Sequence, residues 1–343
     1  MSGATTAVPG SVMRLRELAH SAAGAAAVRA AALLGLPEAV GETPASAAEL
    51  ASAVGADEGA LVRLLRALTA YGVFADGGDG TFAHTAESRL LREDAEHSIK
   101  YNVLWATEPW TWELWPHLDE AVRTGKSVFP SLHGEEFFAH LHARAPQSAE
   151  VFDKAMTQSS QLSARAIADH LDLTGADSVA DIAGGQGLVL ATLLERNPGL
   201  HGTLLDLPEV VARPDARLGE GGSLAARARL LPGDCLREIP VAADVYLFKN
   251  ILEWDDASTV TALRNAAAAA SPGARVLVIE NLVDGSPEMR FTTAMDLLLL
   301  LNVGGKKHTG EGLAALMERA GLRMSGVRPV NSYLHVFEST VPD

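Results

Sequence analysis

Cysteine is almost absent from this chain: its 343 residues include one, Cys235. A single thiol cannot form a disulfide within the chain, which excludes a disulfide-stabilised secreted domain. Long apolar runs are also missing, since Leu297–Leu301 falls far short of the roughly 20 residues of a membrane-spanning helix and is flanked by Asp296 and Asn302. The first residues lack the apolar segment of a secretory signal peptide. These absences predict a soluble, cytoplasmic protein with no membrane partner.

Basic residues are outnumbered by acidic ones. The chain has 28 Lys and Arg against 43 Asp and Glu, which gives a formal net charge of -15 and a pI of about 5.2. An acidic surface repels phosphate backbones, so we expect no nucleic-acid partner. The length favours about two domains.

Aromatic residues are scarce but clustered. They make up 5% of the chain, yet four of the five tryptophans fall between Trp105 and Trp115. Aromatic side chains can enclose a flat ring system, and they can equally fill a core between domains. The sequence leaves both open for residues 96–170, which we expect to form a helical linker and substrate lid.

Residues 1–95 have the pattern of a winged-helix dimerisation domain. Residues 12–41 show helical, alanine-rich spacing, and two further helices are expected at 47–55 and 58–71 before a hairpin. Winged helices often bind DNA, but Asp76 and Asp79 make this wing tip acidic. A dimerisation or packing role is therefore favoured, and the first helix could pack on a partner subunit or on its own domain.

Residues 178–208 read as strand, glycine turn, helix, strand and acid. Gly184 and Gly185 follow a short apolar run directly, and Asp206 ends the second strand. An acid about 20 residues beyond a glycine turn binds ribose hydroxyls in nucleoside-binding units. Asp181 precedes the glycines and would repel a diphosphate, so it suits a cationic or amino-bearing ligand.

The same alternation continues through residues 171–343. It predicts an α/β domain with a doubly wound, Rossmann-like sheet that binds ligands at the carboxyl ends of its strands. Further strands are expected at 227–231, 243–249, 274–280, 323–330 and 332–339, the last two antiparallel because too few residues separate them for a crossover. Four polar side chains fall at expected strand ends: Asp181, Asp206, Asp234 and Lys249.

Six motifs together resemble a known family: DIAGGQG, LLDLP, PGDC, KNILEW, SPGARVLVIE and NVGGKKHT. They are similar to the S-adenosylmethionine-dependent small-molecule O-methyltransferases, in particular bacterial enzymes acting on aromatic polyketides of the anthracycline, tetracenomycin and tetracycline type. The resemblance covers nearly the whole chain. It implies a homodimer with S-adenosyl-L-methionine as cofactor, a small aromatic substrate and no metal.

The resemblance also implies cofactor contacts. Gly184 and Gly185 would lie against the methionine part, Asp206 would bind the ribose, and Leu207 would lie beside the adenine. The other implied cofactor residues are Asp181, Gly233, Asp234 (at the adenine amino group), Cys235 (where the family usually has phenylalanine) and Lys249. The implied substrate contacts are Trp105, Met156, Arg290, Met295, Asp296 and Asn302.

One motif departs from the family. Many members have a histidine general base after the fourth strand, whereas here Glu253 stands at that position and one residue is missing before Trp254. Glu253 and His308 are the candidate catalytic residues, with two alternatives left open: Glu253 as a surface carboxylate, and the loop of His308 as the start of a helix capped by Thr309. A sulfonium methyl group is already activated, so alignment can do most of the work. Glu253 could hold the substrate oxygen or accept a proton.

Three functions stay open from the sequence. The first is methylation of a polycyclic aromatic polyketide, with carbon slightly favoured over oxygen because the histidine base is missing. The second keeps the cofactor for another tailoring reaction, such as hydroxylation or cyclisation. The third, a winged-helix regulator, is disfavoured by the acidic wing.

Overall fold

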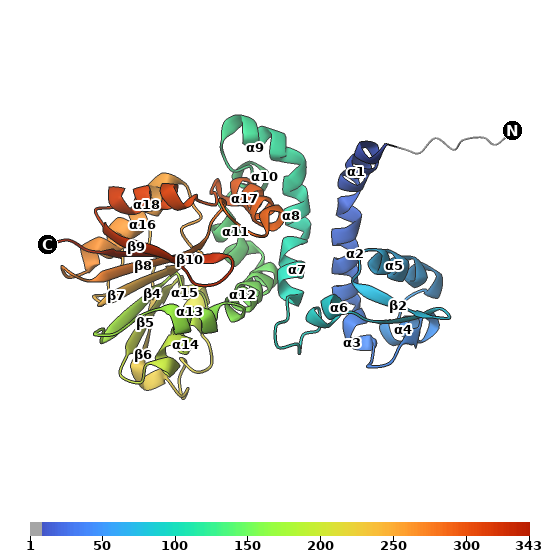
Figure 1. The fold of residues 1–343 in the computed structure, drawn as a ribbon, viewed down its shortest axis with the longest axis horizontal. Coiled ribbons are helices and arrows are strands. Elements are labelled where there is room, and N and C mark those ends of the chain that lie inside the picture. The colour runs from blue at the N-terminus through green and yellow to red at the C-terminus, as the bar shows by residue number, and fades with distance from the viewer. Residues whose placement is uncertain (1–8) are drawn as a thin grey trace. The chain divides into compact units, whose positions relative to one another are not determined.

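The chain divides into two compact units. The computed structural model describes residues 9–343, so residues 1–8 of the expected first domain lie outside the described residues. One unit extends to Pro109 and the other runs from Trp110 to Asp343 (Figure 1). Residues 110–170 therefore pack with the large sheet. The expected division at residues 95 and 170 stays a prediction.

The first unit has the expected winged-helix architecture. Its small sheet has the order β1-β3-β2, with both pairs antiparallel. The predicted helix over 12–41 is interrupted at His20 and at Gly35, which has a φ of 70° and ends a helix as glycine does. The elements are α1 Gly10–Ala19, α2 Ser21–Leu34, α3 Leu36–Ala39, β1 Ala45–Ser46, α4 Ala47–Val54, α5 Glu58–Ala70, β2 Phe74–Gly78, β3 Thr81–His84, α6 Ala86–Leu90 and α7 Lys100–Ala106.

A helical segment begins at the boundary between the two units and belongs almost entirely to the second. It consists of α8 Pro109–Leu114, the 3₁₀ turn Trp115–His117, α9 Leu118–Thr124, α10 Phe129–His133, α11 Phe137–Arg144, α12 Pro146–Gln161 and α13 Ala164–His170. Its aromatic side chains form a core: the rings of Phe129 and Phe137 lie 5.2 Å apart, and Trp110 lies 5.0 Å from Phe137. Leu301 joins this cluster. These aromatic side chains thus fill a core inside the second unit, whereas the sequence left open a core between domains and a site for a flat ring system.

A seven-stranded sheet forms the rest of the second unit, in the order β6-β5-β4-β7-β8-β10-β9. The pairs from β6 to β8 are parallel, and β10 is antiparallel to β8 and β9. The predicted strands are confirmed to within about two residues. The strands are β4 Ser178–Ile182, β5 His201–Asp206, β6 Ala228–Pro232, β7 Val245–Lys249, β8 Arg275–Asn281, β9 Arg323–Pro329 and β10 Leu334–Thr340; the helices are α14 Leu188–Arg196, α15 Pro208–Val211, α16 Asp256–Ala269, α17 Met289–Val303 and α18 Gly310–Arg319.

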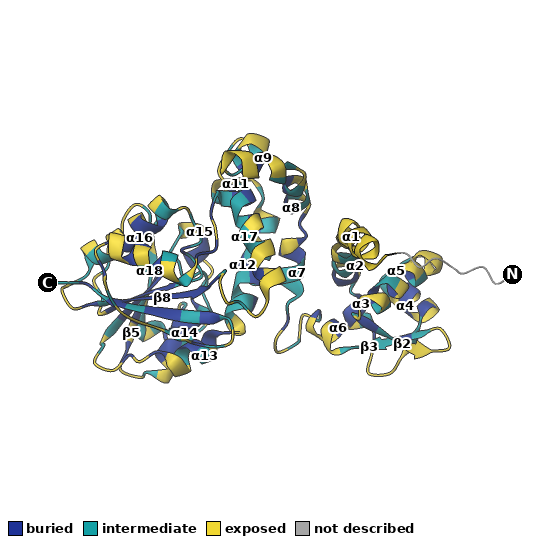
Figure 2. Ribbon diagram, turned by 45° about the horizontal axis from the view of Figure 1, so that its top comes forward, coloured by how far each residue is buried: buried dark blue, intermediate teal, exposed yellow. Residues whose placement is uncertain are grey.

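The central strands of this sheet are buried on both faces. Alternate strand residues enter two separate cores: Ala180 and Ile182 pack with α16 and α18, whereas Val179 packs with α13 and α14. Figure 2 shows the strands as a buried layer between helices. A sheet covered on both faces explains the nearly continuous apolar strands and holds the loops at its carboxyl edge in fixed positions. No helix in residues 9–343 is long and apolar enough to cross a membrane.

Candidate active site at the carboxyl edge of the sheet

The turn between β4 and α14 is built from left-handed backbone. Ala183 has a φ of 51°, which is uncommon for a residue with a side chain and typical of strained functional sites. A Cβ atom at Gly184 would lie 2.5 Å from Oδ2 of Asp181, so the protein itself requires glycine there. A Cβ atom at Gly185 would meet nothing within 4 Å. The turn is therefore tight against the sheet at one glycine and open at the next.

Asp206 lies beside this turn at the end of β5. Its Oδ2 accepts a hydrogen bond from the Gly185 N–H at 2.7 Å, and its Oδ1 accepts one from the Leu207 N–H at 2.7 Å. Burial raises the pKa of Asp206 to about 6, against the lowering effect of these two bonds. Each carboxylate oxygen has a further lone pair, so the oriented group can accept hydrogen bonds from a ribose diol.

Asp181 is the second acid at the turn, and its side chain is 1% exposed. Its Oδ2 accepts no hydrogen bond in the described part of the chain. Burial and the charge of Asp206 raise the pKa of Asp181 to about 7, although Lys249 opposes them. A buried acid is costly without a donor or cation. The two acids therefore fit the ribose and the positively charged methionine part of S-adenosylmethionine, and they do not fit a diphosphate.

Other buried side chains near the strand ends also lack a partner within residues 9–343. Asn250 follows β7, Asn281 ends β8, and Asn302 lies near the end of α17; each has a buried Oδ1 that accepts no hydrogen bond. Buried amide oxygens are normally paired. The positions of Asn250 and Asn281 at strand ends, together with Asp181, support a ligand site along this edge.

Helix α12 is joined to this edge by three polar contacts. Asp153 forms an ion pair with Arg213 at 2.9 Å. Thr157 Oγ1 donates to Gln186 Oε1 at 2.8 Å, in the glycine turn. Residues 153, 157 and 160 share one face of the helix, which thus lies over the loops after β4, β5 and β7. The predicted substrate residue Met156 is half-buried on the same helix.

Lys249 ends β7 and completes these contacts. Its Nζ donates to Ser160 Oγ on α12 at 3.2 Å. Burial lowers the pKa of Lys249 to about 8, while Glu280, Glu253 and Asp181 oppose the shift. The lysine therefore stays mostly protonated at neutral pH and balances several acids.

Glu280, at the end of β8, fixes the loop after β7. Its Oε1 accepts from the N–H groups of Ile251 and Leu252, both at 3.1 Å. Burial, followed by the charge of Glu253, raises the pKa of Glu280 to about 8. The sequence prediction missed this residue, although an acid at the end of a parallel strand was the signal used for Asp206.

Glu253 forms an ion pair with Lys307, a residue the sequence prediction did not single out. The backbone N–H of Lys307 donates to Asp296 Oδ1 at 2.6 Å. The chain passes close here: a Cβ atom at Gly305 would overlap the carbonyl oxygen of Glu253. Burial lowers the pKa of Lys307, but the negative charges of Glu253 and Glu280 have the larger effect, so the pKa is raised overall. The candidate base is thus already paired with a cation.

His308, the other candidate catalytic residue, is buried. Its Nε2 lies 2.6 Å from the Leu252 carbonyl oxygen, and burial lowers the pKa of His308. A neutral imidazole can donate its N–H to this carbonyl. His308 therefore links its own loop to the loop after β7, and a catalytic role stays a prediction.

The remaining predicted cofactor residues follow β5 and β6. The Gly233 N–H donates to the Asp206 carbonyl at 2.9 Å, which places the two strand ends side by side. Asp234 Oδ1 accepts from the Leu236 N–H at 2.9 Å. Cys235 is buried in the core shared with α16, where burial raises the pKa of its thiol to about 12. Their adenine contacts stay predictions.

The predicted substrate residues are placed unevenly. Asp296 lies against Lys307, and the carbonyl of Asn302 accepts from Ser127 Oγ at 2.7 Å. Arg290 is exposed and Met295 half-buried on α17. Trp105 belongs to α7 of the first unit. The substrate contacts of these residues stay predictions.

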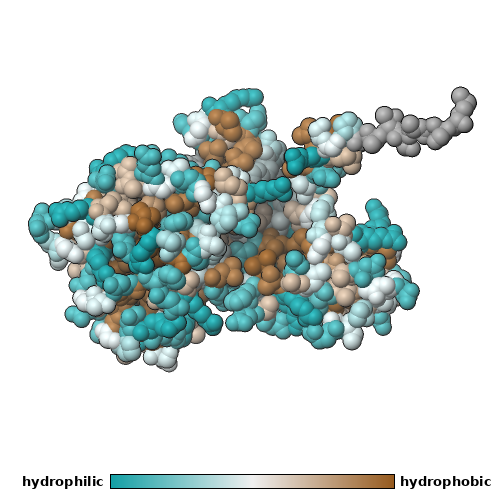
Figure 3. Space-filling view, viewed as in Figure 1, coloured by the Kyte–Doolittle hydropathy of each residue, from teal (hydrophilic) through white to brown (hydrophobic). Residues whose placement is uncertain are grey.

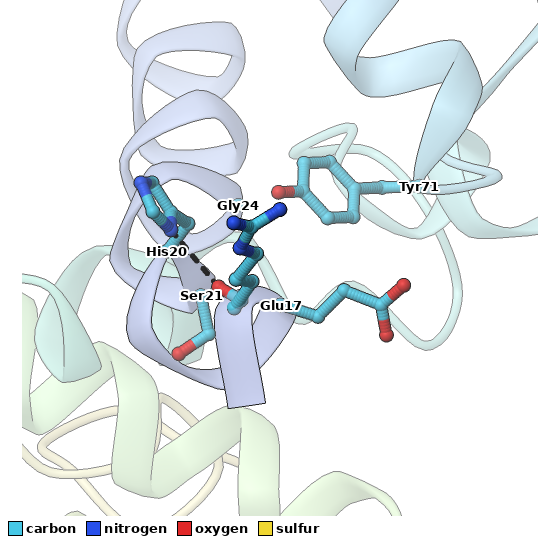
Figure 4. A pocket seen from close by; sticks show the side chains of 6 residues that line it. Glu17, His20, Ser21, Gly24 and Tyr71 are labelled. Atoms are coloured by element: carbon cyan, nitrogen blue, oxygen red, sulfur yellow. Dashed lines mark hydrogen bonds between the residues drawn. The ribbon is translucent and has the colours of Figure 1, made fainter. Parts of the chain in front are cut away.

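A pocket elsewhere in the chain contains none of the predicted residues. It lies in the first unit where α1 meets α2 (Figure 4), and it is lined by Arg16, Glu17, His20, Ser21, Gly24 and Tyr71. A Cβ atom at Gly24 would lie 3.2 Å from the Tyr71 ring. This pocket shares no lining residue with the site at the sheet.

The sheet order and the acids beside the glycine turn define a methyltransferase fold that binds a nucleoside cofactor. Residues 115–323 match the family model of the O-methyltransferase domain, and residues 16–94 match that of the O-methyltransferase dimerisation domain. The chain belongs to this family of S-adenosylmethionine-dependent methyltransferases, as the resemblance predicted.

Known relatives are similar over most of the chain. The mitomycin biosynthesis 6-O-methyltransferase of Streptomyces lavendulae is 40% identical over 317 residues, covering 92% of this chain and 90% of the relative. An O-methyltransferase from neocarzinostatin biosynthesis, solved with S-adenosylmethionine and a naphthoic acid, has a TM-score of 0.78 at 33% identity and covers 93% of this chain and 96% of its own. The aclacinomycin 10-hydroxylase of Streptomyces purpurascens is 33% identical over 225 residues, covering 65% of this chain and 60% of the relative.

Proposed function

We propose that this enzyme transfers a methyl group to a phenolic oxygen of a polycyclic aromatic compound in secondary metabolism. The observation that carries the choice of oxygen is the Glu253–Lys307 ion pair, because an ammonium group at the site can stabilise an oxygen anion. The full-length relatives named above are O-methyltransferases, which supports the same choice. The slight preference for carbon rested only on the missing histidine, and we no longer favour it.

The chain's own residues bind and align the reactants. When bound, S-adenosylmethionine supplies a methyl group activated by its sulfonium charge. Asp206 would hold the ribose, and Asp181 with the open turn at Gly185 would accept the positively charged part. Helix α12, bonded to Gln186 and Lys249, would cover the site and exclude water. Alignment of nucleophile, methyl and sulfur then supplies most of the rate.

Incubation with isotope-labelled cofactor and polycyclic phenols tests this function. We expect a mass gain of one methyl group, and NMR should place it on oxygen. A methyl on ring carbon would restore the alternative derived from the sequence. Fully methylated phenols serve as the control, since they offer no hydroxyl.

A second function is favoured by one specific observation. One relative with similar sequence, the aclacinomycin 10-hydroxylase, is named for hydroxylation and not for methyl transfer. If this chain used the cofactor for another tailoring step, the labelled methyl would stay on the cofactor while the substrate changed mass. The same experiment therefore separates the two functions.

We also infer a homodimer formed through the first unit. Helix α1 contains no buried residue, and Leu15 and Leu18 are 68% and 63% exposed. Figure 3 shows apolar side chains on the surface at α1. Apolar side chains on a helix without a partner favour burial against a second copy, and the match to a dimerisation domain supports this. A cytoplasmic location stays a prediction.

A further inference from the structure

Lys307 is a buried ammonium group at the carboxyl edge of the sheet. The residue is 8% exposed, and its side chain forms an ion pair with Glu253. The hydrogen bond from its N–H to Asp296 fixes its backbone. A buried lysine needs compensation for lost hydration. Its position between two loops of the candidate site therefore suggests a function in binding the substrate.

The ammonium group has capacity beyond this ion pair. It has three N–H donors, and Glu253 is the one acceptor that they contact in residues 9–343. A further acceptor on the substrate can therefore be bound without breaking the existing pair.

Four charged side chains on different structural elements lie around Lys307. Glu253 lies on the loop after β7, Glu280 at the end of β8, and Asp296 on α17, while Lys249 at the end of β7 is the neighbouring cation. Lys306 is directed to Asp256, on α16. Burial raises the pKa of Glu280, and Asp296 accepts a hydrogen bond from the backbone N–H of Lys307, so Glu253 is the carboxylate that pairs directly with the ammonium group.

Glu253 is poorly suited to act as the base in this arrangement. An ion-paired carboxylate that accepts a proton loses the attraction of its cation. The hydroxyl proton of the substrate is better released to solvent when the substrate binds, provided that a fixed positive charge stabilises the resulting anion.

We propose that Lys307 binds the hydroxyl oxygen of the aromatic substrate as its phenolate, and that this charge pairing replaces a histidine base. The proposal rests on the phenol O-methylation proposed above. An electron pair of the oxygen forms the new bond to the methyl carbon, and the methyl–sulfur bond breaks with its electrons remaining on sulfur. The phenol proton has already gone to solvent, and the ammonium keeps all its protons.

A coloured phenol tests this contact without turnover. The probe is a nitronaphthol whose ionised form absorbs at longer wavelength, bound to the enzyme saturated with S-adenosylhomocysteine and titrated from about pH 5 to 9. We expect the wild type to lower the ionisation midpoint of the bound probe by at least about one pH unit. Lys307→Met should remove this shift, and Lys307→Arg should retain most of it.

Two further variants keep the test decisive. Lys306→Met removes the neighbouring lysine and should leave the midpoint unchanged. Glu253→Gln/Lys307→Met removes both charges of the pair, so that no carboxylate is left unpaired, and it should also lack the shift. Calorimetric binding of S-adenosylhomocysteine shows that each variant is folded.

The outcomes separate this inference from the proposed function. A bound probe with the same midpoint in wild type and Lys307→Met overturns the role of Lys307 and leaves O-methylation standing. If Lys306→Met changes the ionisation midpoint as much as Lys307→Met does, the role of Lys307 is also overturned. The shift would then depend on the overall positive charge and not on contact with Lys307. Failure of the wild type to bind any phenol overturns the proposed function and this inference together.

Discussion

Asp181, which is buried, and Asp206, which is half-buried, face the same glycine turn, and the charge of Asp206 adds to burial in raising the pKa of Asp181 to about 7. Gly184 packs against the first acid, and the N–H of Gly185 donates to the second. Neither acid forms an ion pair with a side chain in the described residues. The turn therefore combines two unfavourable charges that a cationic, hydroxyl-bearing cofactor can compensate.

The first prediction concerns the ribose contact. Asp206→Ala should weaken binding of S-adenosylmethionine by about 2–4 kcal/mol, because a pair of charge-assisted hydrogen bonds is lost. Calorimetry measures the affinity. The control is Glu209→Gln, which removes an exposed charge nearby and should leave affinity nearly unchanged. Equal affinities for Asp206→Ala and wild type would show that Asp206 does not hold the ribose.

The second prediction concerns the dependence of stability on pH. The pKa of Asp181 in the folded state lies above the ordinary value of 3.8, so the folded chain binds more protons than the unfolded chain between about pH 4 and 7. The free energy of unfolding contributed by this group therefore falls as pH rises through that range. Without cofactor, Asp181→Asn should unfold at a higher temperature than wild type at pH 8.

The same substitution should weaken cofactor binding, because it removes the charge that faces the cation. The stability difference between the two forms should shrink towards pH 4, where the folded wild type is protonated at this position. Thermal unfolding at several pH values, with and without S-adenosylhomocysteine, checks both effects. A variant that is less stable than wild type at pH 8 would contradict the assigned environment of Asp181.

The third prediction concerns the close approach at Gly305. Gly305→Ala should lower the free energy of unfolding by roughly 2 kcal/mol or more, because its Cβ would overlap the Glu253 carbonyl oxygen. The matched control is Gly304→Ala, where a φ of 66° makes alanine unfavourable by about 1 kcal/mol without a comparable overlap. Denaturant unfolding compares the two. An equal loss of unfolding free energy in the two variants would mean that the loops containing Gly305 and Glu253 can move apart easily.

The fourth prediction concerns Glu253. Glu253→Gln should retain turnover within about 10-fold of wild type, whereas loss of a general base typically costs 10²–10⁴-fold. Glutamine preserves the size and removes the charge that holds Lys307 in place. The loss should shrink as pH rises, because the phenol then arrives ionised. Single-turnover rates from about pH 6 to 9 measure this, and a collapse at every pH with cofactor binding intact would identify Glu253 as an essential base.

The fifth prediction concerns assembly. We expect a homodimer whose interface exceeds about 2,000 Å², as in obligate dimers. Leu15→Glu/Leu18→Glu should produce monomers by light scattering at micromolar concentration. Val122→Glu, on an exposed position of α9, should leave the dimer intact. A monomeric wild type would contradict the prediction directly.

Most of the fold could be predicted from sequence periodicity. Strands buried on both faces, such as Val245–Lys249, read as short apolar runs, and glycines or prolines end the helices between them. The interruption of the first helix at His20 was missed because the apolar spacing of Leu15 and Leu18 continues into the alanine-rich sequence after it.

The site was only partly predictable. Asp206 and the glycine turn are local in sequence, so their spacing alone indicates a nucleoside site, and the resemblance of six motifs along the chain implied the family and its cofactor. The Glu253–Lys307 pair joins residues 54 positions apart. Only packing of the loop after α17 against the loop after β7, allowed by the missing side chain at Gly305, brings them together. The sequence by itself determined which cofactor is bound, whereas the tertiary structure decided which charges face the acceptor, because burial and long-range contact create that environment.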